Sequence, residues 1–128
     1  MFSKGKVITL ILIFVIVLIC ASCCVISKQE VFDGNRVKNQ NLYDLSFSAM
    51  NKTDSHSMSF EKGSRIHVSF LIDKGDVDLY IESDSIKCYQ GNNISSGNFF
   101  IDIEELGIYA IKVNAKKASG RIKIERTK

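Results

Sequence analysis

The stretch RIHVSFLIDKGDVDLYIE, residues 65–82, decides the fold class of this 128-residue chain. On both sides of the segment 73–76, apolar residues occupy every second position. This period of two is typical of a β-strand with one buried face, because a helix would scatter the same residues around its circumference. Since Gly75 lies in the interrupting segment, the pattern predicts a β-hairpin that turns at residues 73–76.

The same alternation recurs in short runs after residue 41. Further strands are predicted at 43–49, 56–60, 86–90, 99–103, 109–113 and 121–125. Turn residues lie between them, among them the turns predicted at 51–54 and 117–120. About eight short strands separated by turns predict an all-β fold, an antiparallel two-sheet β-sandwich. The two inward-facing rows of such a sandwich form one core.

The predicted core consists of the apolar residues at alternate strand positions. They are Leu45, Phe47, Phe60, Ile66, Val68, Phe70, Val77, Leu79, Ile81, Phe99, Ile101, Tyr109, Ile111, Val113, Ile122 and Ile124. No stretch after residue 41 keeps a helical period for long enough to predict a helix of ordinary length.

The N-terminus has the three-part order of a secretory signal. Lys4 and Lys6 precede an apolar run at 7–19, and the small residues Ala21 and Ser22 lie directly before Cys23. Residues 1–22 resemble a bacterial lipoprotein signal peptide. The resemblance implies cleavage before Cys23 and a lipid such as palmitate on that cysteine, with the neighbouring Cys24 as the alternative position.

A second interpretation treats the apolar span 7–26 as an uncleaved transmembrane helix, since about 20 residues are enough to cross a bilayer. In both interpretations the positive charges of Lys4 and Lys6 stay in the cytoplasm. The domain is therefore expected at the extracytoplasmic face of the cell membrane, where either a lipid or the anchor helix holds it.

Residues 23–41 follow the predicted signal peptide, and from Ser27 on they are mostly polar and contain the turn signal Asp33-Gly34-Asn35. They are predicted to be a tether that holds a β-sandwich domain, residues 42–128, away from the membrane. The alternative is a first edge strand at 31–37.

The charge balance of the chain indicates which classes of partner it can bind. The chain has 17 basic and 14 acidic side chains, and Lys4 and Lys6 belong to the N-terminal signal, so the remainder is close to neutral. Binding to nucleic acid requires a concentrated basic surface, which this composition does not favour. The basic residues after Ile111 are interpreted as the solvated face of edge strands.

Two segments, 75–81 (GDVDLYI) and 107–113 (GIYAIKV), resemble paired strand motifs of the bacterial pre-peptidase C-terminal domain and similar jelly-roll accessory modules. The resemblance extends over roughly residues 59–125. It implies a jelly-roll-like β-sandwich that acts as a secreted, non-catalytic binding or accessory module. In that family the module is attached to a catalytic domain, whereas here a solitary module is expected.

The sequence contains none of the short motifs of nucleophilic, zinc-dependent or phosphate-binding enzymes. We therefore expect no enzymatic activity and no cofactor. His56 and His67 lack neighbouring metal ligands. Asp76 and Asp78 point to the same side of a strand, which makes them the candidate pair for Ca²⁺; solvated turn positions are the alternative.

Ligand binding is expected to involve exposed aromatic rings, which can stack on a sugar or a peptide. Phe100 and Tyr80 are the named candidates, and Tyr43 and Tyr89 are further aromatic residues that an outward face would expose. Phe100 is favoured because Phe99 and Ile101 already occupy the inward row.

Cys88 is the one cysteine of the predicted domain. It is expected to be either a buried thiol or the partner of Cys24 in a disulfide.

These observations predict a non-catalytic binding or structural domain at the cell surface, with a protein or carbohydrate partner. The alternative is a carbohydrate- or peptide-binding accessory module held by an uncleaved helix. Exposed aromatic residues beside a groove would favour carbohydrate or peptide binding, and a uniformly polar surface would favour a structural role.

Overall fold

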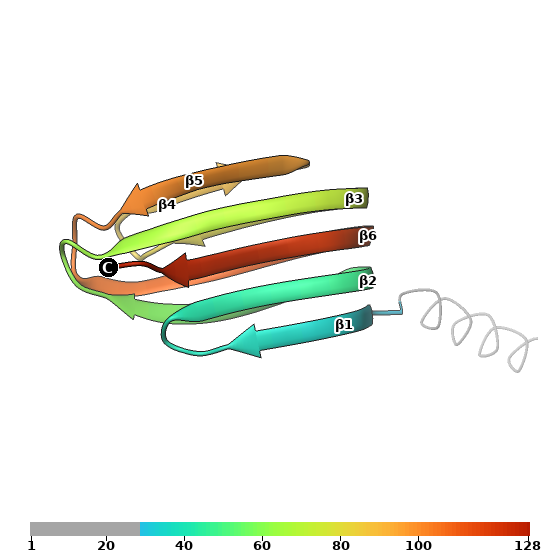
Figure 1. Ribbon diagram of the computed structural model, residues 1–128, viewed down its shortest axis with the longest axis horizontal. Helices are drawn as coiled ribbons and strands as arrows, with labels where there is room; N and C mark the ends of the chain where they lie inside the picture. Colours follow the sequence, from blue (N-terminus) through green and yellow to red (C-terminus); the bar gives the residue numbers. More distant parts are fainter. Residues whose placement is uncertain (1–28) are drawn as a thin grey trace, which may run out of the picture.

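The computed structural model of the chain describes residues 29–128 (Figure 1). The predicted all-β, antiparallel class is confirmed, with six strands instead of about eight. They are β1 (Val31–Lys38), β2 (Leu42–Phe60), β3 (Arg65–Glu82), β4 (Lys87–Gly91), β5 (Ser96–Asp102) and β6 (Gly107–Arg126). Within this range there is no helix long and apolar enough to cross a membrane.

Three of the strands are unusually long: β2, β3 and β6 have 19, 18 and 20 residues, against a typical length of about five or six. The strand order is β1-β2-β6-β3-β4, and β5 also pairs with β3. In Figure 1 the long strands turn back on themselves at the end of the molecule where β1 begins. We call this the bent end. One sheet is thereby folded into two layers.

Each long strand contributes one half to each layer. The first layer contains β1, β5, the first halves of β2 and β3 and the second half of β6, as the partners Leu45–Ile122 and Val68–Ile124 show. The second layer contains β4 and the remaining halves, where Leu79 lies opposite Val113.

The predicted hairpin at residues 73–76 is wrong. β3 continues through this segment, and both of its halves pair with β6. The pairing is irregular between Ile72 and Asp76, where Gly75 has a φ of 80°. A bulge of this kind bends a strand instead of reversing it.

The turns predicted at 51–54 and 117–120 are wrong for the same reason. The first lies inside β2 and the second inside β6, next to irregular pairing. In each long strand, a cluster of Asn, Asp, Lys and Gly residues thus marks a bend and not a turn. The two strands predicted on either side of each cluster are halves of one long strand.

The tether prediction also needs correction. Residues 31–38 form β1, which pairs with β2 from Asn51 to Tyr43, so the alternative of an edge strand is the one that the structure contains. The domain thus begins before residue 42. Residues 1–28, which include the predicted signal peptide and Cys23, lie outside the described residues.

The core between the layers follows the predicted alternation closely. All predicted core residues are buried, except Phe99 and Ile101, which are half-buried and packed against the others. The core also contains residues that were not predicted: Tyr43, Met50, Met58, Ile94, Ile103, Ala115 and Ala118. On the side of β4 and β5, the rings of Phe70, Tyr89 and Phe99 close the gap between the layers, with centroids 4.9–6.4 Å apart.

We predict that Gly75→Ala destabilises the domain by about 3 kcal/mol, because the substitution adds strain at positive φ and overpacks the bend. An added Cβ would lie 2.6 Å from the carbonyl oxygen of Lys116 on β6. The matched control is Gly63→Ala, where φ is 93° but no atom lies within 4 Å of an added Cβ. Its expected cost is about 1 kcal/mol. Chemical denaturation measures both values, and equal losses would contradict this account of the bend.

Candidate functional site

Phe100 is a large apolar side chain on the outer face of the first layer, with 50% of its surface exposed. It lies on β5, which pairs only with β3. Its neighbours on the inward row, Phe99 and Ile101, pack against the core, so the alternation of the strand directs Phe100 outward. The prediction that this ring is accessible to a ligand agrees with its position.

Four polar side chains surround Phe100, and with it they form what we call the β5 platform: Arg65, His67, Asn98, Phe100 and Asp102. The ring of His67 is stacked on that of Phe100, with centroids 4.7 Å apart and an interplanar angle of 28°. The guanidinium carbon of Arg65 lies 4.3 Å from the centroid of the Phe100 ring.

Hydrogen bonds and an ion pair hold the polar members in place. His67 Nε2 donates to Asn98 Oδ1, and Arg65 Nε lies 3.3 Å from Asp102 Oδ1. The platform is therefore an oriented aromatic ring within a set of planar polar groups, arranged before any ligand arrives.

A shallow groove begins next to the platform and crosses the same outer face toward β1. It consists of two adjoining hollows of about 250 Å³ and 410 Å³, and Leu71 and Arg121 line both of them. Asn98 lies at the β5 end and Asn35 at the β1 end. Leu71 is 57% exposed. Asp44 fixes the Arg121 guanidinium through hydrogen bonds of 3.0 and 3.3 Å.

The other aromatic candidates occupy different places. Tyr80 lies on the second-layer half of β3, where its hydroxyl donates to Asn92 Oδ1 over 2.8 Å, so it does not join Phe100 in one site. Tyr43 and Tyr89 were predicted as outward-facing residues, and this is wrong. Tyr43 is fully buried, and Tyr89 packs against Phe99.

The structure brings no metal site together. Among residues 29–128 there is no group of three or more His, Cys, Asp or Glu side chains that could hold a metal ion. Asp76 lies opposite Lys116 in the sheet, and Asp78 Oδ1 accepts a hydrogen bond from the amide of Asn93 over 2.8 Å. His56 and His67 lie in different layers.

Cys88 is half-buried beside the core. Burial, and secondly the negative charge of Glu104, raises the pKa of its thiol. Cys23 and Cys24 lie outside the described residues, so the lipidation site and the Cys24–Cys88 disulfide stay predictions.

A buried polar cluster that the sequence did not predict surrounds Asp54, a residue of the turn predicted at 51–54. Asp54 lies on the inward row of β2 in the second layer, beyond the last residue that pairs with β1. The Tyr43 hydroxyl donates a hydrogen bond to Asp54 Oδ2. Lys38 Nζ lies 3.2 Å and Arg36 Nε 3.6 Å from the same carboxylate. We call these four residues the Asp54 clasp.

The clasp connects the two layers on the side of β1, where the ring centroid of Tyr43 also lies 5.3 Å from that of His56 in the second layer. Arg36, Lys38 and Tyr43 come from the first layer, and Asp54 comes from the second. Since every polar atom of the carboxylate has a partner, the burial of its charge is compensated. Arg36 and Lys38 alternate along β1 and lie opposite the buried residues Leu45 and Tyr43. This alternation could have indicated the cluster, but the segment was predicted to be a tether.

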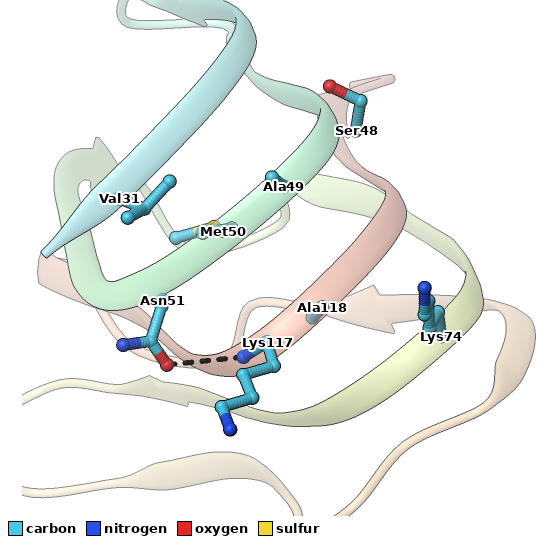
Figure 2. A pocket seen from close by; sticks show the side chains of 8 residues that line it. All are labelled: Val31, Ser48, Ala49, Met50, Asn51, Lys74, Lys117 and Ala118. Carbon is cyan, nitrogen blue, oxygen red and sulfur yellow. Dashed lines mark hydrogen bonds between the residues drawn. The ribbon is translucent and has the colours of Figure 1, made fainter.

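Two more hollows lie at opposite ends of the sandwich. At the bent end, Lys74 and Lys117 flank an apolar cleft of about 390 Å³ (Figure 2). At the other end, a more polar hollow of about 530 Å³ lies beside the exposed residues Leu106 and Ile108.

The clasp predicts a specific dependence of stability on pH. Burial, then the hydrogen bond to Asp54 and its negative charge, raises the pKa of Tyr43 far above the usual 10. The folded chain therefore holds this proton more tightly than the unfolded chain does, so the stabilisation is complete below pH 10 and declines as the pH rises further. We predict that Tyr43→Phe costs roughly 1–3 kcal/mol at pH 8, and that the difference narrows above pH 10.

Denaturation at pH 8, 10 and 11 tests this prediction. The control is Tyr80→Phe, which removes an exposed hydroxyl and should cost less than about 0.5 kcal/mol at pH 8. The buried Tyr109 is common to all three proteins and cancels in the comparison. A difference between wild type and Tyr43→Phe that is constant across this pH range would contradict the prediction.

No protein-family model and no curated protein matches this chain, so the motif resemblance at 75–81 and 107–113 gains no support from a family model. Among solved structures, the chain is similar to a mutant of CBM29-2, a family 29 carbohydrate-binding module whose structure addresses ligand recognition. The identity is 12% and the TM-score 0.35, over 77% of this chain and 87% of the module. At these values the likeness says nothing about a ligand of this chain.

Proposed function

We propose that this chain is an exported, membrane-held lipoprotein whose β-sandwich domain binds a carbohydrate at the cell surface without catalysing a reaction. The observation that carries the proposal is the half-exposed Phe100 ring beside a shallow groove on the outer face of the first layer. Of the alternatives that the sequence left open, an exposed aromatic ring next to a groove favours a binding module over a purely structural domain.

The chemistry of the face suits a sugar chain. A pyranose ring has an apolar C–H face that stacks on an aromatic ring, and its hydroxyl groups need donors and acceptors at the rim. Phe100 offers the ring, and Asn98 and Arg65 offer planar hydrogen-bonding groups next to it. The groove continues past Leu71 and Arg121, which gives room for further sugar units along the sheet.

Three ion-paired carboxylates on this face support a non-catalytic role. Asp102 is paired with Arg65, Asp44 with Arg121, and Glu125 with Lys123. Glycoside hydrolysis needs two carboxyl groups that face each other across the bond, one of them protonated near neutral pH. Each of these three carboxylates faces a cation instead, an arrangement that suits this face to binding.

A peptide added as an extra strand is a less favoured ligand at the edge of β2 in the second layer. Side chains already occupy backbone groups of this edge. The Gln40 amide oxygen accepts from the Ser59 amide, the Arg126 guanidinium donates to the Ser59 carbonyl, and Lys38 donates to the Ser55 carbonyl over 2.8 Å. Such protection of an edge opposes strand addition.

Carbohydrate binding is tested by calorimetry of the full chain in detergent with soluble glucans, mannans and peptidoglycan fragments. We expect Phe100→Ala to weaken binding at least about tenfold, since truncating a central aromatic residue costs about 2 kcal/mol or more. Tyr80→Ala, which removes a ring from the other outer face, should leave the affinity unchanged. The proposal fails if none of these polysaccharides binds, or if the two variants lose affinity equally.

Membrane attachment is tested by mass spectrometry of the mature chain. A lipoprotein begins at Cys23 and carries acyl chains, which together hold a domain on a membrane at about 0.8 kcal/mol per buried methylene. Cys23→Ala should then leave an unprocessed, unacylated chain, while Cys88→Ala should be processed normally. If the wild-type protein retains Met1, the lipid anchor is excluded and the uncleaved transmembrane helix is the remaining interpretation.

A further inference from the structure

We propose that the cleft at the bent end of the sandwich binds the headgroup of an anionic phospholipid, so that the domain sits with this end on the membrane. The inference rests on the membrane attachment proposed above and adds an orientation and a lipid partner. It is independent of Phe100, which lies on an outer face of the sheet.

The cleft combines an apolar floor with two ammonium groups. Ala49, Met50 and Ala118 line the floor, and Val31 lies at one side. Figure 2 shows Lys74 and Lys117 on opposite sides of Ala118. The eight lining residues include no acidic side chain. The headgroup of an anionic phospholipid matches this lining. Its phosphate charge attracts the two lysines, and the carbon atoms next to the phosphate can pack against the apolar floor.

Both lysines are available for an external anion. Neither forms an ion pair with any of residues 29–128, whereas the nearby Lys52 lies 3.9 Å from Glu30. Asp73 and Asp76 are exposed on either side of Lys74 and Gly75, and they do not line the cleft.

The backbone fixes one lysine at the rim. Lys117 has a φ of 47°, a left-handed conformation that is uncommon outside glycine. Asn51 Oδ1, which also lines the cleft, accepts a hydrogen bond from the Lys117 amide over 3.2 Å. The position of this lysine is therefore determined by the bulge of β6 and not only by its own flexible side chain.

The connection to the membrane is short. Asn51 Nδ2 donates to the carbonyl of Gln29 over 3.2 Å, so the chain enters the domain beside the cleft. Gln29 is the sixth residue after Cys23, and a fully extended chain of six residues spans about 20 Å at most. A lipid on Cys23 thus keeps the bent end near the bilayer surface, where the potential of anionic lipids attracts lysines.

The full acylated chain is reconstituted into nanodiscs of phosphatidylcholine alone or with phosphatidylglycerol, and the acylation rate of each lysine is measured by mass spectrometry. We expect Lys74 and Lys117 to react about fivefold more slowly in the anionic discs, and high salt to restore part of the rate. Lys62, in the turn between β2 and β3 at the other end of the sandwich, should react at the same rate in both discs.

A variant comparison tests the same site without labelling. Anionic lipid that stays with the protein through detergent purification is counted by native mass spectrometry. The double variant Lys74→Gln with Lys117→Gln should lose this lipid, and Lys62→Gln should retain it. All three side chains are exposed, so folding is not expected to change.

Several outcomes would overturn the inference. Equal labelling of Lys74 and Lys117 in both discs, or equal protection of Lys62, would exclude a headgroup site at the cleft. Protection by inorganic phosphate in neutral discs would assign the cleft to a free anion. A chain that does not enter the discs overturns the proposed attachment and this inference together, whereas incorporation without protection overturns the inference alone.

Discussion

The bend in the three long strands is the constraint on which the rest of the structure depends. β2, β3 and β6 each pass from one layer into the other without leaving the sheet. At the bend, Gly75 comes close to the backbone of Lys116, and Gly120 comes close to Ile72, where an added Cβ would lie 2.9 Å from its Cα. Side chains at these two positions would hold neighbouring strands apart. The absence of a Cβ lets the sheet fold and enclose one core.

A sheet folded at one end leaves two open sides, and the chain closes them by different means. On the side of β4 and β5, the rings of Phe70, Tyr89 and Phe99 fill the gap. On the side of β1, the strand covers only the first layer, and Arg36 and Lys38 extend from it to the buried Asp54. The hydrophobic effect closes one side without directional demands. The clasp depends on fixed geometry, because a buried carboxylate needs its partners in place.

The bend also sets the relation between the two proposed binding surfaces. Because the chain enters the domain at the bent end, that end lies toward the proposed membrane anchor, and the outer faces of both layers extend away from it. Phe100 lies on one of these faces, beside the groove that crosses β3 and β6. A domain that contacts lipid through its end keeps this face free for a long polymer at the cell surface. The two proposed functions depend on different side chains, Lys74 and Lys117 for the lipid and Phe100 for the carbohydrate, and Ser48 lines both the cleft and the groove.

The sequence by itself determined the class of the fold, nearly the whole core and the outward position of Phe100. These features follow from the alternation of side chains along a strand, which is a local property of the backbone. Only the tertiary structure decided whether the segments rich in Gly, Asn and Asp reverse the chain or bend it. A turn and a bulge use the same residues, and the choice depends on whether a neighbouring strand continues alongside, as β6 does for β3. The Asp54 clasp and the cleft of Lys74 and Lys117 were not predicted for the same reason. Each joins residues from different strands, and a local sequence pattern does not determine which strands pair.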